Sequence, residues 1–171
     1  MALSGALVSY ALVEGDQVVM TGGLGQMSLT DSTPSRLIVI RIGSITKAFT
    51  ALALMKRAEK NQVKLQQSIK NIWPAAPLAN PYPQSPVTLE MLLEHTTGLT
   101  ELSGKKFNAP TSLSLQQAFQ VRADTRPVKW QPGYYKSYSN AGAGYVAAAI
   151  EHISKRDYDT WFIKLSCIKW V

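Results

Sequence analysis

A serine and a lysine three residues apart, Ser44 and Lys47, form the first combination of side chains that could carry chemistry. On a helix this spacing places both side chains on the same face. A neutral lysine can take the proton of a serine hydroxyl, which then attacks a carbonyl carbon. The same Ser-x-x-Lys pattern recurs at Ser103 and Ser166, so the pattern is weak by itself. Its alternative meaning is a helix-capping serine followed by a solvated lysine.

The position of Ser44 distinguishes it from the other two matches. Ser44 follows an apolar, strand-like segment (37–42) and precedes a helical pattern, whereas Ser103 lies in a polar loop and Ser166 in the tail. A hydroxyl at a helix N-terminus lies beside free backbone N–H groups and the positive end of the helix dipole. Those groups can stabilise the oxyanion that forms when a hydroxyl attacks a carbonyl.

A second pair with chemical potential, Tyr138 and Asn140, forms the only Tyr-x-Asn in the chain and directly precedes a helical pattern. A tyrosine hydroxyl near a lysine cation can act as a general base or proton relay. An asparagine amide offers both a donor and an acceptor, so it can bridge Lys47 and a substrate amide. The alternative is a loop tyrosine followed by an asparagine that caps the next helix.

The N-terminal third must position Ser44. Apolar residues over 6–13 predict a buried strand, and with a turn at 14–16 and a returning segment over 17–21 they predict a β-hairpin. The glycine-rich 22–25 predicts a loop. Residues 37–42 predict another strand. Apolar residues at helical spacing between Ile45 and Met55 predict a helix, with Ser44 as its N-cap. We expect this helix to be buried on most sides near its start and to become polar from Lys56.

The remaining two thirds read as helices joined by loops. Five prolines over 74–86 predict a rigid, irregular crossing. A short helix is expected at 89–94, capped by Thr88, and a loop at 95–98. Further helices are expected at 113–122, with Ser112 or Ser114 near the cap, and at 141–153, with a turn at 130–133 between them. The many small residues of the last helix would let it pack very closely.

The composition of the 171 residues excludes several classes of protein. An apolar share of 46% with 17% charged residues excludes a disordered chain. The net charge of +7 is spread without a basic cluster, which argues against nucleic-acid binding. No apolar run is long enough for a transmembrane segment, no signal peptide is visible, and one cysteine excludes an internal disulfide. Two histidines and one cysteine far apart in sequence make a metal site unexpected.

A third segment, Leu92–Leu99, reads Leu-Leu-Glu-His-Thr-Thr-Gly-Leu. Taken together, the ordered segments Gly-Ser-Ile-Thr-Lys, Leu-Leu-Glu-His-Thr-Thr-Gly-Leu and Pro-Gly-(four residues)-Tyr-Ser-Asn-Ala-Gly resemble the serine beta-lactamase and penicillin-binding protein superfamily. The resemblance is nearest to the branch of class C beta-lactamases, D-Ala-D-Ala carboxypeptidases and related esterases. It extends from about residue 5 to about residue 163.

The resemblance implies a role for each residue of these motifs. Ser44 would be the acylated nucleophile, Lys47 its activating partner, Tyr138 the base or proton relay, and Asn140 the positioner of Lys47 and of the substrate amide. The segment with Glu94 and His95 would be structural, below the site. The implied fold is α/β of the α+β type, beta-lactamase/transpeptidase-like, with N-terminal antiparallel strands and a helical region. The implied substrates are a beta-lactam, a D-Ala peptide or an ester, with no cofactor.

The sequence departs from this family in its last part. The Lys- or His-x-Gly motif that the family carries on a late strand has no counterpart after Asn140. We therefore expect a single domain over 1–171 that is truncated at its C-terminus and lacks the C-terminal strands of the sheet. Unpaired strand edges would favour self-association. The chain would be a weak or inactive hydrolase, and the alternative is a non-catalytic relative with a binding role or none. Relatives are often periplasmic or extracellular, but the compartment stays open.

Overall fold

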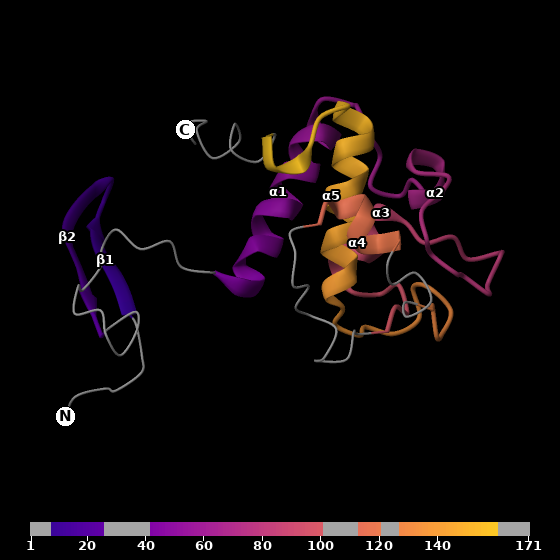
Figure 1. Cartoon of the computed structure of the whole chain (residues 1–171), viewed down its shortest axis with the longest axis horizontal. Helices are drawn as coiled ribbons and strands as arrows, with labels where there is room; N and C mark the ends of the chain where they lie inside the picture. The colour runs from indigo at the N-terminus through magenta and orange to yellow at the C-terminus, as the bar shows by residue number, and fades with distance from the viewer. Residues whose placement is uncertain (1–7, 26–41, 101–112, 121–126, 161–171) are drawn as a thin grey trace. The chain divides into compact units, whose positions relative to one another are not determined.

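The computed structural model describes residues 8–25, 42–100, 113–120 and 127–160. The chain divides into two compact units, Met1–Gly43 and Ser44–Val171. We call the first the hairpin unit and the second the helical body, and each is described by itself (Figure 1). The expectation of one domain over 1–171 stays a prediction.

The predicted hairpin is confirmed. Strand β1 (Val8–Glu14) pairs antiparallel with β2 (Gln17–Leu24), and Gly15 takes a positive φ of 61° at the turn. The loop expected at 22–25 is wrong for its first three residues, which belong to β2. Tyr10 pairs with Gly22, and its hydroxyl occupies the space that a Cβ there would need. Glycine lets the Tyr10 ring lie over this position of the strand, and a larger residue there would require the ring to move.

The expected burial of the strand over 6–13 is wrong for its described residues, because the side chains of the hairpin are largely exposed although most of them are apolar. Large hydrophobic residues more than 40% exposed occur on both of its strands: Val8, Tyr10, Leu12, Val13, Val18, Val19, Met20 and Leu24. Among the described residues β1 and β2 form a two-stranded sheet, so each has one unpaired edge. The strand expected at 37–42 lies outside the described residues, apart from Ile42. Self-association through these edges stays a prediction.

The helix that carries Lys47 begins with a tight turn. A 3-10 turn, Gly43–Ile45, leads into α1 (Thr46–Glu59). The prediction that Ser44 caps this helix is wrong, because the N-cap residue is Ile45, which makes no side-chain capping bond. The side chain of Ser44 is thereby left available for other partners.

The expected burial of α1 is wrong as well. Only one face is buried, at Thr50, Ala53 and Leu54, whereas Leu52 and Met55 are 44% and 49% exposed. Apolar spacing alone overestimated the burial, because it counts apolar residues and does not show which of them meet a neighbouring element. The buried face is the one turned toward the long helix described below.

Two short helices flank the proline-rich crossing. Helix α2 (Ile69–Ile72) has Ser68 as its N-cap, and the sequence interpretation missed it. Helix α3 (Leu89–Glu94) is confirmed with its expected cap, because the Thr88 hydroxyl accepts a hydrogen bond from the Met91 N–H. Between them the chain is irregular, as five prolines predict.

Helix α4 (Leu115–Gln120) begins at one of the two expected caps. The Ser114 hydroxyl accepts from the Gln117 N–H at 3.2 Å, and the Gln117 side chain accepts from the Ser114 N–H at 3.0 Å. This reciprocal pair is a capping box. Residues 112, 121 and 122 of the expected helix lie outside the described residues.

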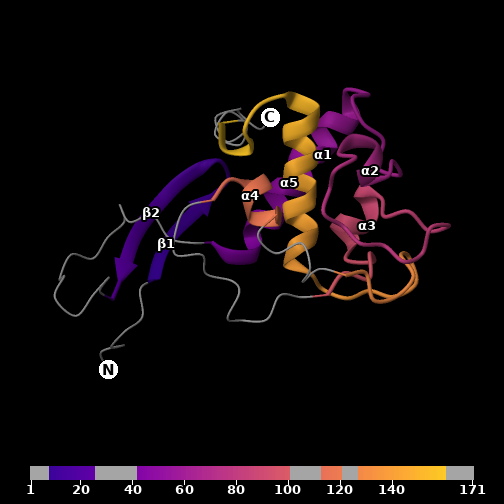
Figure 2. The same cartoon turned by 45° about the vertical axis from the view of Figure 1, so that its right-hand side comes forward.

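Helix α5 (Asn140–Ser154) forms the centre of the helical body. It runs beside α1, and both helices begin at the same end of the body (Figures 1 and 2). A Cβ on Gly142 would lie 2.6 Å from the Leu92 carbonyl oxygen, so glycine permits α3 to approach this closely. The predicted close packing of a small-residue helix is confirmed. Near its C-terminal half, Trp73 packs edge-on against Phe119 and stacks on His152.

No helix among the described residues combines the length and the apolar character needed to cross a membrane. The described part is a mixture of an antiparallel hairpin and a helical body. This arrangement agrees with the expected α+β class.

Candidate active site

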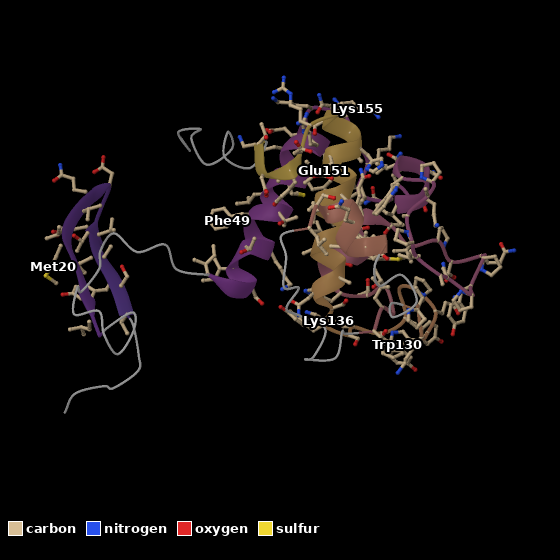
Figure 3. All side chains as sticks on the ribbon, viewed as in Figure 1. Met20, Phe49, Trp130, Lys136, Glu151 and Lys155 are labelled. Atoms are coloured by element: carbon tan, nitrogen blue, oxygen red, sulfur yellow. The ribbon has the colours of Figure 1, made fainter. Side chains whose placement is uncertain are left out.

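The four residues singled out by the sequence meet at the shared N-terminal end of α1 and α5. Ser44 lies in the turn before α1, and Lys47 lies in the first turn of that helix. Tyr138 lies in the loop before α5, and Asn140 is the first residue of α5. Figure 3 shows Lys136, two residues before Tyr138, near that end of α5. Ser44 and Tyr138 are 94 positions apart in sequence, and Lys47 and Asn140 are 93 positions apart. The packing of α1 along α5 brings them together.

The Ser44 hydroxyl has two polar partners. Its Oγ lies 2.6 Å from the Tyr138 hydroxyl oxygen, and the Lys47 ammonium donates to it at 3.1 Å. Ser44 is exposed and Tyr138 is half exposed, so a substrate can reach both oxygens. The hydroxyl is therefore accessible and already in contact with a cation and a phenol.

Asn140 holds the lysine from the other side. The Asn140 Oδ1 accepts a hydrogen bond from Lys47 Nζ at 2.5 Å and one from the Tyr138 hydroxyl at 3.3 Å. Lys47 Nζ also lies 4.8 Å from the centre of the Tyr138 ring, within cation–π range. The alternative that Asn140 caps the last helix is wrong, because the N-cap of α5 is Ser139 and Asn140 lies within the helix.

These hydrogen bonds define a route for a proton. When Tyr138 donates to Asn140 Oδ1, the phenol oxygen is left to accept from Ser44, so the serine proton points to Tyr138. Lys47 then donates to the serine oxygen and would stabilise negative charge growing there. Ser44, Lys47 and Tyr138 thus lie within hydrogen-bonding distance along the contacts Lys47–Ser44 and Ser44–Tyr138, the range in which a proton can pass between such groups.

His95 is a further residue at this site, which the sequence interpretation placed in a structural segment. Its ring centre lies 4.6 Å from that of Tyr138, and its Nδ1 accepts a hydrogen bond from the Ser139 N–H at 3.3 Å. The signal that could have found it is its place in the Leu92–Leu99 motif. Glu94, its neighbour, is exposed at the end of α3.

A second hydroxyl–phenol pair lies further along α1. Thr50 is buried, and its Oγ1 lies 2.8 Å from the Tyr158 hydroxyl while donating to the Thr46 carbonyl. Burial raises the pKa of Tyr158 and the Asp159 carboxylate adds to the effect, whereas the Thr50 hydrogen bond acts in the opposite direction. The Tyr158 N–H donates to Glu151, which Figure 3 shows on the C-terminal half of α5. Through these hydrogen bonds Tyr158 connects the segment after α5 to α1 and to α5.

Two hollows of the helical body are lined by residues other than these four. One is lined by Gln116, Glu151, His152, Lys155, Arg156 and Asp157, and another by residues of α2 and the proline-rich crossing. No group of three potential metal ligands occurs within the described ranges. The case for chemistry at Ser44 rests on the side chains that converge there.

Comparison with known proteins gives the family. A family model described as Beta-lactamase matches residues 4–163. D-alanyl-D-alanine-carboxypeptidase/endopeptidase AmpH of Escherichia coli is 27% identical over 158 residues, which cover 91% of this chain and 41% of that protein. Penicillin-binding protein 4* of Bacillus subtilis is 26% identical and is aligned over 90% of this chain and 34% of its own length. The chain thus spans about two fifths or less of these relatives.

A solved structure shares the fold. The octameric penicillin-binding protein homologue from Pyrococcus abyssi superposes with a TM-score of 0.74 at 26% identity, over 92% of this chain and 37% of that one. The fold is therefore that of a family of serine hydrolases related to penicillin-binding proteins. The chain belongs to the Beta-lactamase family. The expected beta-lactamase/transpeptidase-like fold is confirmed.

Proposed function

We propose that this chain transfers an acyl group from a carbonyl substrate to Ser44. The observation that carries the proposal is the contact of the Ser44 hydroxyl with both Tyr138 and Lys47. The substrate class is a beta-lactam, a peptide ending in D-Ala or an ester, since each presents an activated or accessible carbonyl to a nucleophilic serine.

The proposed reaction has two halves. In the first, Ser44 Oγ bonds to the carbonyl carbon while its proton passes to the Tyr138 oxygen, which acts as the base in its phenolate form beside the Lys47 cation. The bond from the carbonyl carbon to the leaving group breaks, and the leaving group takes up that proton. In the second half, water attacks the acyl-enzyme, and the products are the free acid and the regenerated serine.

Each partner has a defined contribution. Lys47 lies where its positive charge offsets the charge that develops on the serine oxygen. Asn140 keeps the lysine in place through the contact of Oδ1 with Nζ, and its amide nitrogen is suited to a substrate carbonyl. The relatives' names support the class of reaction, because AmpH is a carboxypeptidase/endopeptidase acting on D-alanyl-D-alanine.

The test is labelling of the purified chain with a fluorescent penicillin and, separately, with an activated ester. We expect a mass adduct of the acyl group on wild type and none on Ser44→Ala. Ser103→Ala is the matched control, because Ser103 also begins a Ser-x-x-Lys pattern and has no assigned role. Equal labelling of wild type and Ser44→Ala would refute the proposal.

The same experiment tests the alternative of a relative without turnover. A stable adduct on Ser44 with no release of product indicates acylation without deacylation. Binding of the probe without an adduct indicates a binding role alone. Release of product that depends on Ser44 identifies a complete hydrolase.

A further inference from the structure

His95 holds a backbone conformation that few residues adopt. It ends α3 in the left-handed region, with φ 63° and ψ 33°. Histidine and asparagine enter this region more readily than most residues with side chains, and glycine enters it without cost. The conformation turns the chain away from α3, and the His95 carbonyl and ring then meet the loop that carries Tyr138.

His95 accepts two hydrogen bonds, one from the residue before Tyr138 and one from the residue after it. The Ser137 N–H donates to the His95 carbonyl oxygen at 2.7 Å, and the Ser139 N–H donates to the His95 Nδ1 at 3.3 Å. Ser139 is only 1% exposed, so water cannot easily replace the second acceptor. One residue thus holds the backbone immediately before and immediately after the tyrosine.

The ring of His95 also contacts the ring of Tyr138. The ring centres are 4.6 Å apart, with 35° between the planes. Since the tyrosine backbone is fixed on both sides and its ring is supported on one face, the phenol oxygen has little freedom to leave Ser44. The separation of 2.6 Å between the two hydroxyl oxygens depends on that restraint.

We propose that His95 is a positioning residue that sets the place of the Tyr138 hydroxyl through the Nδ1 acceptor and the ring contact. It does not touch the reacting atoms. Accepting from Ser139 requires an Nδ1 without a proton, so the neutral ring carries its proton on Nε2. The inference rests on the proposed function for its effect on rate, but its effect on the loop can be measured without any reaction.

The test compares three variants whose new residues all enter the left-handed region. His95→Asn can place an amide oxygen near the position of Nδ1 and keeps the acceptor, whereas His95→Gly relaxes the backbone and removes both acceptor and ring. Lys155→Gly is the matched control, because Lys155 takes a φ of 54° at the C-cap of α5 and has no assigned part in the site. We measure acylation of Ser44 by an activated ester, separating the maximal rate from the half-saturating concentration.

The expected result is a fall in the maximal acylation rate of about 10²-fold for His95→Gly, the size expected for a misplacement of about 1 Å. The half-saturating concentration should change little. His95→Asn should recover most of the lost rate, and Lys155→Gly should match wild type. Equal loss in His95→Asn and His95→Gly, or no loss in either, would overturn the proposal.

A second measurement keeps the two proposals distinguishable. Hydrogen exchange of the Ser139 amide, followed by NMR, should accelerate in His95→Gly and stay slow in His95→Asn and Lys155→Gly. If wild type is not acylated, the proposed function fails while this exchange pattern still supports the positioning role. If Ser139 exchange is the same in all four proteins, the positioning role is wrong whatever the activity.

Discussion

Helix α1 carries two hydroxyl–phenol pairs that look alike in distance and differ in surroundings. Ser44 and Tyr138 lie 2.6 Å apart at its start, and Thr50 and Tyr158 lie 2.8 Å apart near its middle. The first pair is exposed, and a lysine and an asparagine complete it. In the second pair the threonine is buried and donates to a backbone carbonyl. We call them the outer pair and the inner pair.

The surroundings of the two pairs favour reactivity in the outer pair and a contribution to stability in the inner pair. In the outer pair a cation lies beside the serine oxygen, and solvent and substrate can reach it, so loss of a proton from the serine can be compensated. In the inner pair burial disfavours a charged phenol and raises its pKa. A short contact between a hydroxyl and a phenol is therefore not sufficient for catalysis, and the groups around it decide what it does.

The largest expected effect comes from removing the cation of the outer pair. Lys47→Met keeps the length of the side chain and loses the ammonium that contacts Ser44 and Asn140. We expect acylation of Ser44 by an activated ester to slow by about 10³-fold, within the range for loss of a group that stabilises charge on the reacting oxygens. Stopped-flow or mass-resolved kinetics measure the rate.

Lys60→Met is the control for this change. Lys60 is exposed at the C-cap of α1, so the variant removes one positive charge from the same helix without altering the outer pair. Its acylation rate should equal that of wild type. A comparable slowing in both variants would mean that the total charge, and not the Lys47 contact, controls the reaction.

The next largest effect comes from making the same change, tyrosine to phenylalanine, in each of the two pairs. Tyr138→Phe removes the hydroxyl next to Ser44 and should slow acylation by about 10²-fold. Tyr158→Phe makes the same chemical change in the inner pair and should leave the rate unchanged. In urea unfolding, Tyr158→Phe should lower the free energy of unfolding by more than Tyr138→Phe does. It loses a partly buried hydrogen bond, at a cost of about 1 kcal/mol. A rate loss in Tyr158→Phe would contradict the distinction between the pairs.

The outer pair could be predicted from sequence, because its residues lie in motifs whose order is characteristic of a family. The same motifs assigned Ser44, Lys47, Tyr138 and Asn140 roles that only kinetics can test. The inner pair could not be predicted, since Thr50 and Tyr158 belong to no motif and meet only because α1 packs along α5. His95 was recognised as part of a motif, yet its bond to Ser139 depends on a left-handed backbone that its sequence does not specify.

The fold was predictable where a local signal is strong. The hairpin and the cap of α3 follow from turn residues and from Thr88. The burial of α1 was not predictable, because Leu52 and Met55 fit an apolar face yet remain exposed. The four-residue helix α2 is too short for periodicity to reveal.

A moderate effect on stability should follow from removing the aliphatic hydroxyl of the inner pair, and a much smaller one from removing that of the outer pair. Thr50→Val removes the bond to Tyr158 and the bond to the Thr46 carbonyl, and it leaves the Tyr158 hydroxyl without this partner. We expect a loss of about 1–3 kcal/mol in the free energy of unfolding. Ser44→Ala acts at an exposed site and should change that free energy by less than about 0.5 kcal/mol. Equal losses would show that burial does not distinguish the pairs.

The smallest expected effect is a dependence of stability on pH that comes from Tyr158. Its pKa lies above the usual tyrosine value of about 10, because burial disfavours the phenolate and Asp159 repels it. Above pH 10 or so the unfolded chain loses this proton before the folded chain does. The unfolded state then binds fewer protons, so unfolding becomes easier as the pH rises.

The contribution of Tyr158 is therefore complete below a pH of about 10 and is lost as the pH rises through its value in the folded chain. Urea unfolding of wild type and Tyr158→Phe between about pH 8 and pH 11 isolates it, because the other titrating groups are common to both proteins. We expect the advantage of wild type to narrow above pH 10 or so. A constant or widening advantage would mean that the phenol ionises as readily in the folded chain as in the unfolded one. The inner pair would then lack the burial that distinguishes it from the outer pair.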